Sequence, residues 1–378
     1  EWINENNAKP GDRLPTQTVF VKMLNCSQST VHKAMQSLVR QGIIYRKVGH
    51  GTYFSSPLKS NRAGANSIRD GIDERTFSIL SQRILVCSIV KSSQIPSNSP
   101  SHEMLAHAET ELHSKLGEGS KIFLGEFSKL DELEKNALQF TPTGVIADWK
   151  TLHESKISPI ALEFSFEKIN APVVHCFHFC DYAYPLRNIV MLDNSKIGLI
   201  AVKHLVEIGH TKILIASVSR DLGFVNERIL GAKEMASFYG IKPIVHIPKE
   251  KIPDTPKFWE LSGLSAYKYW KSLNKSERPS AFFAINDKMG VGFILAAKKD
   301  GVKIPEDVSV IGVDNEIGLY FQCGLNMTTI DPRRHDVGRS AANWLIKILA
   351  KQNMYEDSNI LRIAPRLIIR ESTKQAVG

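Results

Sequence analysis

From residue 82 onward, short apolar segments alternate with amphipathic segments of helical period, and this alternation constrains the fold more than any other feature of the sequence. The apolar segments are nearly continuous, as in Ile84–Val90 and Ala281–Ile285. Such strands are typical of parallel sheets covered by helices on both faces. About nine of them in roughly 290 residues are more than one domain usually holds. We therefore expect a doubly wound α/β body of two similar lobes with a cleft between them.

The length of 378 residues predicts a multidomain chain, because single cores stop growing near about 250–300 residues. No run approaches the roughly 18 apolar residues of a membrane-spanning helix. The first residues, EWINENNAKPGDR, show no basic segment followed by an apolar one. We expect a cytoplasmic protein without a membrane partner. The five cysteines are scattered without a C-x-x-C pair, which favours buried free thiols.

Positive charge is concentrated at the start of the chain. Residues 1–80 contain 11 Lys and Arg against 6 Asp and Glu, giving +5 of the total +9. A basic module on a nearly neutral body indicates a polyanionic partner.

The clearest helical period in this module follows two N-cap candidates, Ser27 and Ser29, and ends at Gly42. Its apolar stripe consists of Val31, Ala34, Met35 and Leu38. Its opposite face is polar and can reach base edges or phosphates. Two short strands then enclose a basic, glycine-rich tip at 46–51. Two helices followed by such a hairpin predict a winged helix-turn-helix whose second helix enters the major groove of double-stranded DNA.

The run PGDRLPTQTVFVKMLNCSQSTVHKAMQSLVRQGIIYRKVGHGTYF resembles the DNA-binding domain of the GntR family over nearly its whole length. Carried over by motif position, the resemblance implies that DNA is contacted by Arg13, Ser29, Thr30, His32, Lys33, His50 and Gly51. Gln28, on the same polar face, completes the predicted set. Family members commonly have Arg where Gln28 and His32 stand, so we expect a different operator preference.

Residues 56–81 are polar, contain Pro57, Gly64 and Gly71, and show no sustained period, which predicts a linker. The expected division is a winged helix-turn-helix at 1–55, a linker at 56–81 and an effector-binding domain at 82–378.

Polar residues follow several predicted strands, at the edge where open parallel sheets bind ligands. They include Ser92, Asp148, Asn286 and Asp314. Each alone is also typical of a turn or a helix N-cap, so the functional interpretation depends on several of them converging.

Four further segments resemble the sensor domain of the LacI/GalR repressors: DNSKIGLIAVKHLVEIGHTKILIA, NDKMGVGFILAAKKDGVKIPEDVSVIGVDN, TTIDPRRHDVG and RLIIRES. The resemblance implies a periplasmic-binding-protein type I fold with three crossovers between lobes. It places the first lobe at about 82–190 and 328–350, and the second at about 191–327 and 351–372. It further implies an effector in the cleft, usually a sugar or a nucleobase-like molecule, held by Arg228, Asn286 and Asp314, with Asp331 on a crossover beside it.

The first lobe departs from the family pattern. The sequence between Phe127 and Thr143 is short, and the loop SSQIPSNSPSHEM is atypical. The candidate contacts in this lobe are Ser92, His102, Asp148 and Trp149.

Catalytic motifs are sparse. The chain has no G-x-x-x-x-G-K-[ST], G-x-S-x-G or H-E-x-x-H, so we expect neither an enzyme nor a cofactor. Cys176, His178 and Cys180 alternate on one strand face, but this spacing is weak support for a metal site and we predict none.

The combination of a GntR-like winged helix and a LacI/GalR-like sensor is similar to arabinose-type repressors. It implies a homodimeric transcriptional repressor of carbohydrate-utilisation genes, released from its operator by a small sugar-like ligand. Two alternatives remain open: a solute-binding protein of a transporter, and a corepressor-dependent regulator that senses a ligand other than a sugar.

Overall fold

The computed structural model describes residues 12, 14–24, 31, 35, 44–47, 51–54, 82–89, 100–117, 119–127, 129–148, 165, 167–177, 188–218, 222–316, 318–350 and 360–376. The chain divides into two compact units, Glu1–Phe77 and Ser78–Gly378. The predicted linker, 56–81, lies outside the described residues.

The first unit contains a helix and a hairpin. Helix α2 (Gln17–Leu24) precedes the antiparallel strands β1 (Ile44–Lys47) and β2 (Gly51–Phe54). The backbone N–H of Leu14 donates to the carbonyl of Thr52 at 2.8 Å, which ties the segment before α2 to the hairpin. The side chains of Val31 and Met35 are buried, as expected for the apolar stripe of the second helix.

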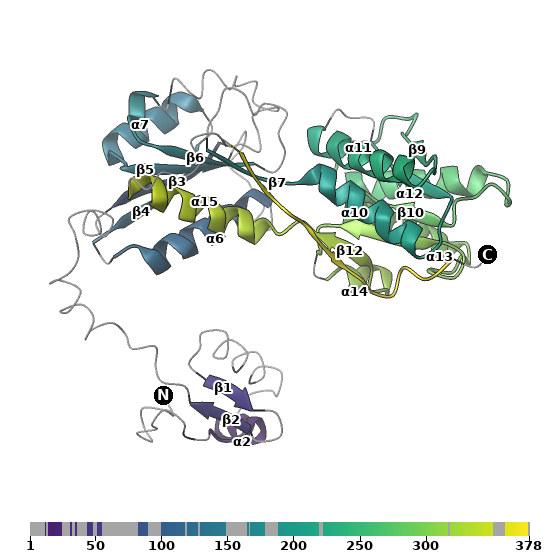
Figure 1. Ribbon diagram of the computed structural model, residues 1–378, viewed down its shortest axis with the longest axis horizontal. Coiled ribbons are helices and arrows are strands. Elements are labelled where there is room, and N and C mark those ends of the chain that lie inside the picture. Colours follow the sequence, from purple (N-terminus) through teal and green to yellow (C-terminus); the bar gives the residue numbers. More distant parts are fainter. Residues whose placement is uncertain are drawn as a thin grey trace. The chain divides into compact units, whose positions relative to one another are not determined.

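The second unit contains two six-stranded sheets, one in each lobe. The sheet of the first lobe is parallel throughout and has the order β13 (Ile360–Ile363), β7 (Ile189–Leu192), β6 (Val173–Phe177), β5 (Gly144–Asp148), β3 (Arg83–Ile89), β4 (Lys121–Phe127). Helices α6 (Pro100–Lys115) and α15 (Arg334–Leu349) lie side by side against one face of this sheet (Figure 1). Helix α7 (Leu130–Phe140) covers the other face.

The sheet of the second lobe has the order β14 (Arg366–Ile368), β12 (Thr328–Asp331), β11 (Ser309–Val313), β10 (Ala281–Phe283), β8 (Ile213–Ala216), β9 (Ile244–His246). All neighbours are parallel except β12 and β14. The helices of this lobe are α10 (Asn194–Glu207), α11 (Gly223–Phe238), α12 (Phe258–Ser272), α13 (Asp287–Lys299) and α14 (Leu319–Cys323).

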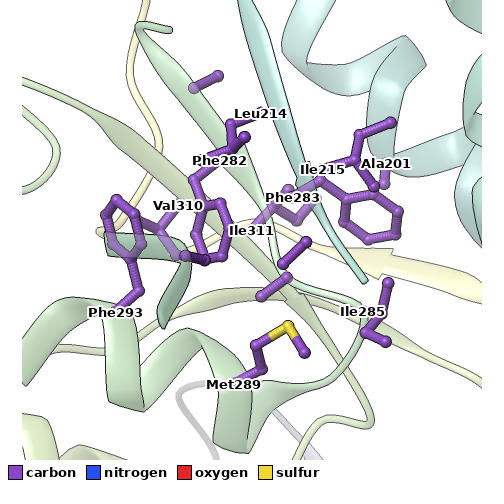
Figure 2. Close-up of a cluster of buried hydrophobic side chains, with 14 of the residues drawn as sticks. Ala201, Leu214, Ile215, Phe282, Phe283, Ile285, Met289, Phe293, Val310 and Ile311 are labelled. Atoms are coloured by element: carbon purple, nitrogen blue, oxygen red, sulfur yellow. The ribbon is translucent and has the colours of Figure 1, made fainter. Parts of the chain in front are cut away.

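The core of the second lobe is apolar and closely packed. The rings of Phe282 in β10 and Phe293 in α13 stack with centroids 4.1 Å apart (Figure 2). Val310, Leu214 and Met289 lie in the same buried cluster. The near-continuous apolar strands are therefore covered by helices, as the alternation in the sequence predicted.

The chain passes between the lobes after β7, after β12 and after β13, so the two sheets are joined by the expected three crossovers. The expected lobe limits were wrong at two strands. Residues 328–331 pair with β11 and belong to the second sheet, whereas 360–363 pair with β7 and belong to the first. The physical reason is that short apolar strands look alike in sequence, and only the hydrogen bonds to their neighbours assign them to a sheet.

Glycines bring the helices of three pairs close together. A Cβ atom at Gly198 of α10 would lie 1.8 Å from the carbonyl oxygen of Arg228, and one at Gly231 of α11 would lie 1.9 Å from that of Ser195. The same close approach occurs between α12 and α13 and between α6 and α15. The backbone of α11 that carries Arg228 is therefore held directly against α10.

No helix in the described part of the chain is long and apolar enough to cross a membrane.

Candidate functional site

Arg228 is the largest of the fully buried side chains in the described residues. Its Nε donates to Asn194 Oδ1 at 3.0 Å, and its Nη1 donates to the carbonyl oxygen of Ile285. Its Cζ lies 5.1 Å from the centroid of the Phe224 ring. Burial lowers the pKa of Arg228 to about 10, which still leaves the guanidinium charged at neutral pH. These contacts hold its remaining nitrogen, Nη2, 3.8 Å from Asp314 Oδ1.

Asp314 directly follows β11, with a left-handed backbone (φ 114°) that non-glycine residues rarely adopt. Its backbone N–H donates to the carbonyl of Ile330 at 2.9 Å. Its Oδ1 accepts a hydrogen bond of 2.6 Å from Arg334 Nη2. Because Arg334 begins α15 of the first lobe, this ion pair joins the two lobes at the carboxyl end of β11.

Asn286 and Asp287 lie at the start of α13. Asn286 Oδ1 accepts a hydrogen bond of 2.8 Å from the backbone of Met289 and so caps the helix. Asp287 accepts hydrogen bonds from Thr329 Oγ1 (2.7 Å) and from the backbone N–H of Glu316 (2.9 Å). Burial, followed by the charge of Asp314, raises the pKa of Asp287 to about 8. Asp287 is therefore mostly protonated at pH 7.

Asp331 lies at the end of β12, where the chain leaves the second lobe. Its Oδ1 accepts a hydrogen bond from the Arg333 backbone at 2.8 Å, and its Oδ2 accepts one from Arg366 Nη2 at 3.3 Å. The carboxylate therefore holds two crossover segments together.

Of the candidates in the first lobe, Asp148 and His102 are described. Asp148 ends β5 and is fully buried. Burial, then the charge of Asp148, raises the pKa of Cys87 and of Cys176 above the ordinary thiol value. His102 is exposed on α6. Ser92 and Trp149 lie outside the described residues.

Among the predicted DNA contacts, Gly51 is described and opens β2, paired with Lys47 of β1. The other predicted contacts lie outside the described residues: Arg13, Gln28, Ser29, Thr30, His32, Lys33 and His50. Where the structure describes the chain, no three His, Cys, Asp or Glu side chains are grouped as a metal site, and His178 and Cys180 are not among its described residues.

Two residues at this junction were missed by sequence reasoning. Asn194 accepts a hydrogen bond from Arg228, and Arg334 donates one to Asp314. Asn194 stands in the DN pair at the start of a helix, which gave a signal only for capping. Arg334 stands in the PRR run after β12, where nothing in the spacing shows that it reaches a strand end of the other lobe.

Comparisons with family models match both parts of the chain. Residues 1–54 match the model described as bacterial regulatory proteins, gntR family. Residues 202–373 match the model of a periplasmic binding protein-like domain.

Curated relatives match either nearly the whole chain or about half of it. The arabinose metabolism transcriptional repressor of Geobacillus stearothermophilus is 22% identical over 385 residues, covering 99% of this chain and 95% of the relative. The HTH-type transcriptional repressor PurR of Aliivibrio salmonicida is 32% identical over 185 residues, covering 48% of this chain and 52% of the relative.

Solved structures share the fold at low identity. A regulatory protein of the LacI family from Chloroflexus aggregans has a TM-score of 0.60 and 18% identity, covering 78% of this chain and 99% of that chain. A LacI family regulator from Enterococcus faecium with bound ribose has a TM-score of 0.57 and 20% identity, covering 78% of this chain and all of that chain. The lac repressor dimer bound to operator and the anti-inducer ONPF has a TM-score of 0.58 and 16% identity, covering 83% of this chain and 98% of that chain.

Proposed function

We propose that this chain, which joins a gntR-family DNA-binding region to a two-lobed periplasmic-binding-protein-like domain, is an effector-responsive transcriptional repressor. The observation that carries the proposal is the presence of both regions in one chain. The first supplies the means of binding DNA and the second supplies two lobes that can enclose a small molecule. The relatives named above are regulators rather than enzymes, and the chain acts by binding.

The DNA-binding surface consists of the eight residues assigned from the sequence, namely Arg13, Gln28, Ser29, Thr30, His32, Lys33, His50 and Gly51. Lys33 and Arg13 neutralise phosphates, and the polar side chains of the second helix read base edges. Because the partner is operator DNA, the protein acts in the cytoplasm. Two copies bind a pseudo-palindromic operator, so the active form is a homodimer. The domain limits that fit this arrangement are 1–55, 56–81 and 82–378.

The effector binds where the lobes meet. Arg228 and Asp314 contact it from the second lobe, and Asn286 and Asp331 hold the adjoining helix and crossover in place. Asp148, Ser92, His102 and Trp149 are the candidate contacts of the first lobe. A sugar-like effector is favoured because a relative spanning the whole chain is named for arabinose metabolism and a solved neighbour contains ribose.

In this mechanism the effector binds both lobes and stabilises one arrangement of them. The operator favours the other arrangement, so effector binding lowers the affinity for DNA.

The test begins with in vitro selection of random duplex DNA by the full chain. We expect enrichment of a two-fold symmetric sequence. Adding candidate sugars to the selected complex should then release the DNA, which fluorescence anisotropy measures. Failure to enrich any sequence would contradict the proposed function. A ligand that tightens DNA binding would make the protein corepressor-dependent.

A further inference from the structure

Two arginines approach the same carboxylate oxygen at the junction of the lobes. Asp314 Oδ1 lies 2.6 Å from Arg334 Nη2 and 3.8 Å from Arg228 Nη2. The side chains of Arg228, Arg334 and Asp314 are 1%, 11% and 20% exposed. Two cations and one anion therefore meet at a place with little water to screen them.

Each arginine also has a buried donor without a protein acceptor. Arg228 Nη2 and Arg334 Nε are shielded from solvent and have no hydrogen-bond partner within the described part of the chain. A buried donor that lacks an acceptor destabilises the folded chain, and a charged donor does so more strongly. Such donors point to an acceptor that the protein itself does not supply.

The neighbouring acids offset the excess positive charge only in part. Asp287 is mostly protonated, because its pKa is raised to about 8. Glu227 pairs with Arg362 at 3.8 Å, and Glu316 pairs with Lys288 at 3.4 Å. Glu103 is 44% exposed and lies 3.7 Å from Arg334 Nη1, a distance and exposure at which water screens its charge strongly.

The helix that carries Arg334 adds to the positive potential. Its N-cap residue, Arg333, has a left-handed backbone (φ 62°) and makes no side-chain capping bond. The N-terminus of a helix favours anions because its first backbone N–H groups have no partner within the helix and the positive end of the helix dipole lies there.

We infer that the effector is an anionic monosaccharide, whose carboxylate or phosphate oxygens accept hydrogen bonds from Arg228 and Arg334. The planar guanidinium fork matches both anions in geometry. Asp314 can then accept hydrogen bonds from the hydroxyl groups of the sugar. This inference rests on the proposed function and identifies the class of effector for the same site.

The test compares acidic sugars with their neutral counterparts, using the full chain and isothermal titration calorimetry at constant ionic strength. The probes are D-galacturonate, D-glucuronate, D-gluconate and D-glucose 6-phosphate, against D-galactose, D-glucose and L-arabinose. We expect at least one acidic probe to bind tenfold or more tightly than its neutral counterpart. Comparing the carboxylate probes with the phosphate probe shows which of the two anionic groups the site binds.

Variants then test the role of Arg334. Arg334→Gln should lower the affinity for the acidic probe at least tenfold, and Arg334→Lys, which retains the charge but not the fork, should lower it less. Arg339→Gln is the matched control, since Arg339 lies on the same helix, is 53% exposed and pairs with Asp336 and Glu111. It should leave the affinity unchanged. The comparison of acidic and neutral probes uses the unaltered chain, so it tests the inference even if a variant does not fold.

Three results would overturn the inference: a neutral sugar that binds as well as its acidic counterpart, an Arg334→Gln variant with full affinity, or a chain that binds its operator but none of the acidic probes. The last result would leave the proposed repressor function standing. Failure to bind any operator would instead contradict the proposed function itself.

Discussion

At the scale of single residues, the site depends on a charged side chain that is fully buried. Arg228 is tolerated there because Asn194 and the carbonyl of Ile285 accept its hydrogen bonds and Asp314 lies nearby. The same contacts orient the guanidinium toward the lobe junction. One residue therefore contributes both to stability and to the proposed binding of the effector.

Replacing this side chain tests both contributions. We expect Arg228→Ala to abolish the response to effector while the chain still binds operator DNA. It should also lower the free energy of unfolding by about 3 kcal/mol, since it leaves buried partners unpaired. Calorimetry, anisotropy and urea denaturation measure the three quantities, and Lys233→Ala on the exposed face of the same helix serves as control. A normal effector response of the Arg228→Ala variant would show that the effector does not bind at Arg228.

A buried histidine predicts how stability depends on pH. Burial lowers the pKa of His175 from its ordinary value of 6.5 to about 3, so the native state keeps this ring neutral. Below pH 6.5 the unfolded chain binds a proton that the native chain does not. The contribution of His175 is therefore complete above pH 6.5 and is lost between pH 6.5 and about 3.

Within this window, proton binding to His175 in the unfolded chain should lower the free energy of unfolding by up to about 1.4 kcal/mol for each unit by which the pH falls. Urea denaturation at pH 7.5, 6.5 and 5.5 should show a smaller pH dependence for His175→Gln than for the unaltered chain. His113→Gln, at an exposed position on α6, should keep the original dependence. Equal dependence in all three proteins would contradict the assignment.

At the scale of elements, glycines allow the backbones of paired helices to approach closely. Gly198 and Gly231 let α10 and α11 approach until the Cα of one residue meets the carbonyl of the opposite helix. The register of this pair places Arg228 of α11 beside Asn194 of α10. Helix packing far from solvent therefore determines the geometry of the site.

Adding one methyl group at this contact should disturb both packing and site. We expect Gly231→Ala to destabilise the chain by about 1–3 kcal/mol, because the added Cβ would lie 1.9 Å from the Ser195 carbonyl oxygen and the helices must separate. Effector affinity should fall with it. Ser237→Ala, exposed on the same helix, should change stability by less than about 0.5 kcal/mol. Thermal and urea unfolding measure the stability of both variants against the unaltered chain. A Gly231→Ala variant of unchanged stability would contradict the close packing.

At the scale of the whole molecule, the proposed function is a coupling between two binding sites in separate units of the chain. Thermodynamic linkage makes such coupling reciprocal. If the effector lowers operator affinity tenfold, saturating operator must lower effector affinity tenfold. Calorimetric titration of the effector with and without the selected operator duplex measures the change in effector affinity, and identical affinities would exclude the coupling. Sedimentation analysis of the operator complex should give two chains per duplex.

Much of this architecture could be predicted from the sequence. The apolar strands, the helical stripe with Val31 and Met35, and the hairpin that ends at Phe54 could be predicted because they depend on periodicity and turn residues within a short stretch of sequence. Arg228, Asn286 and Asp314 could be named as site candidates because motifs of known families carry them. Their burial and contacts could not be read from those motifs.

The tertiary structure alone decided which residues meet. It assigned 328–331 to the second sheet and 360–363 to the first. It also paired Arg334 of the first lobe with Asp314 of the second. These pairings join positions far apart in the chain, and they depend on how two sheets and their helices pack rather than on any local pattern. The sequence by itself therefore determined the elements and the class of fold, whereas packing determined the charge and geometry of the site.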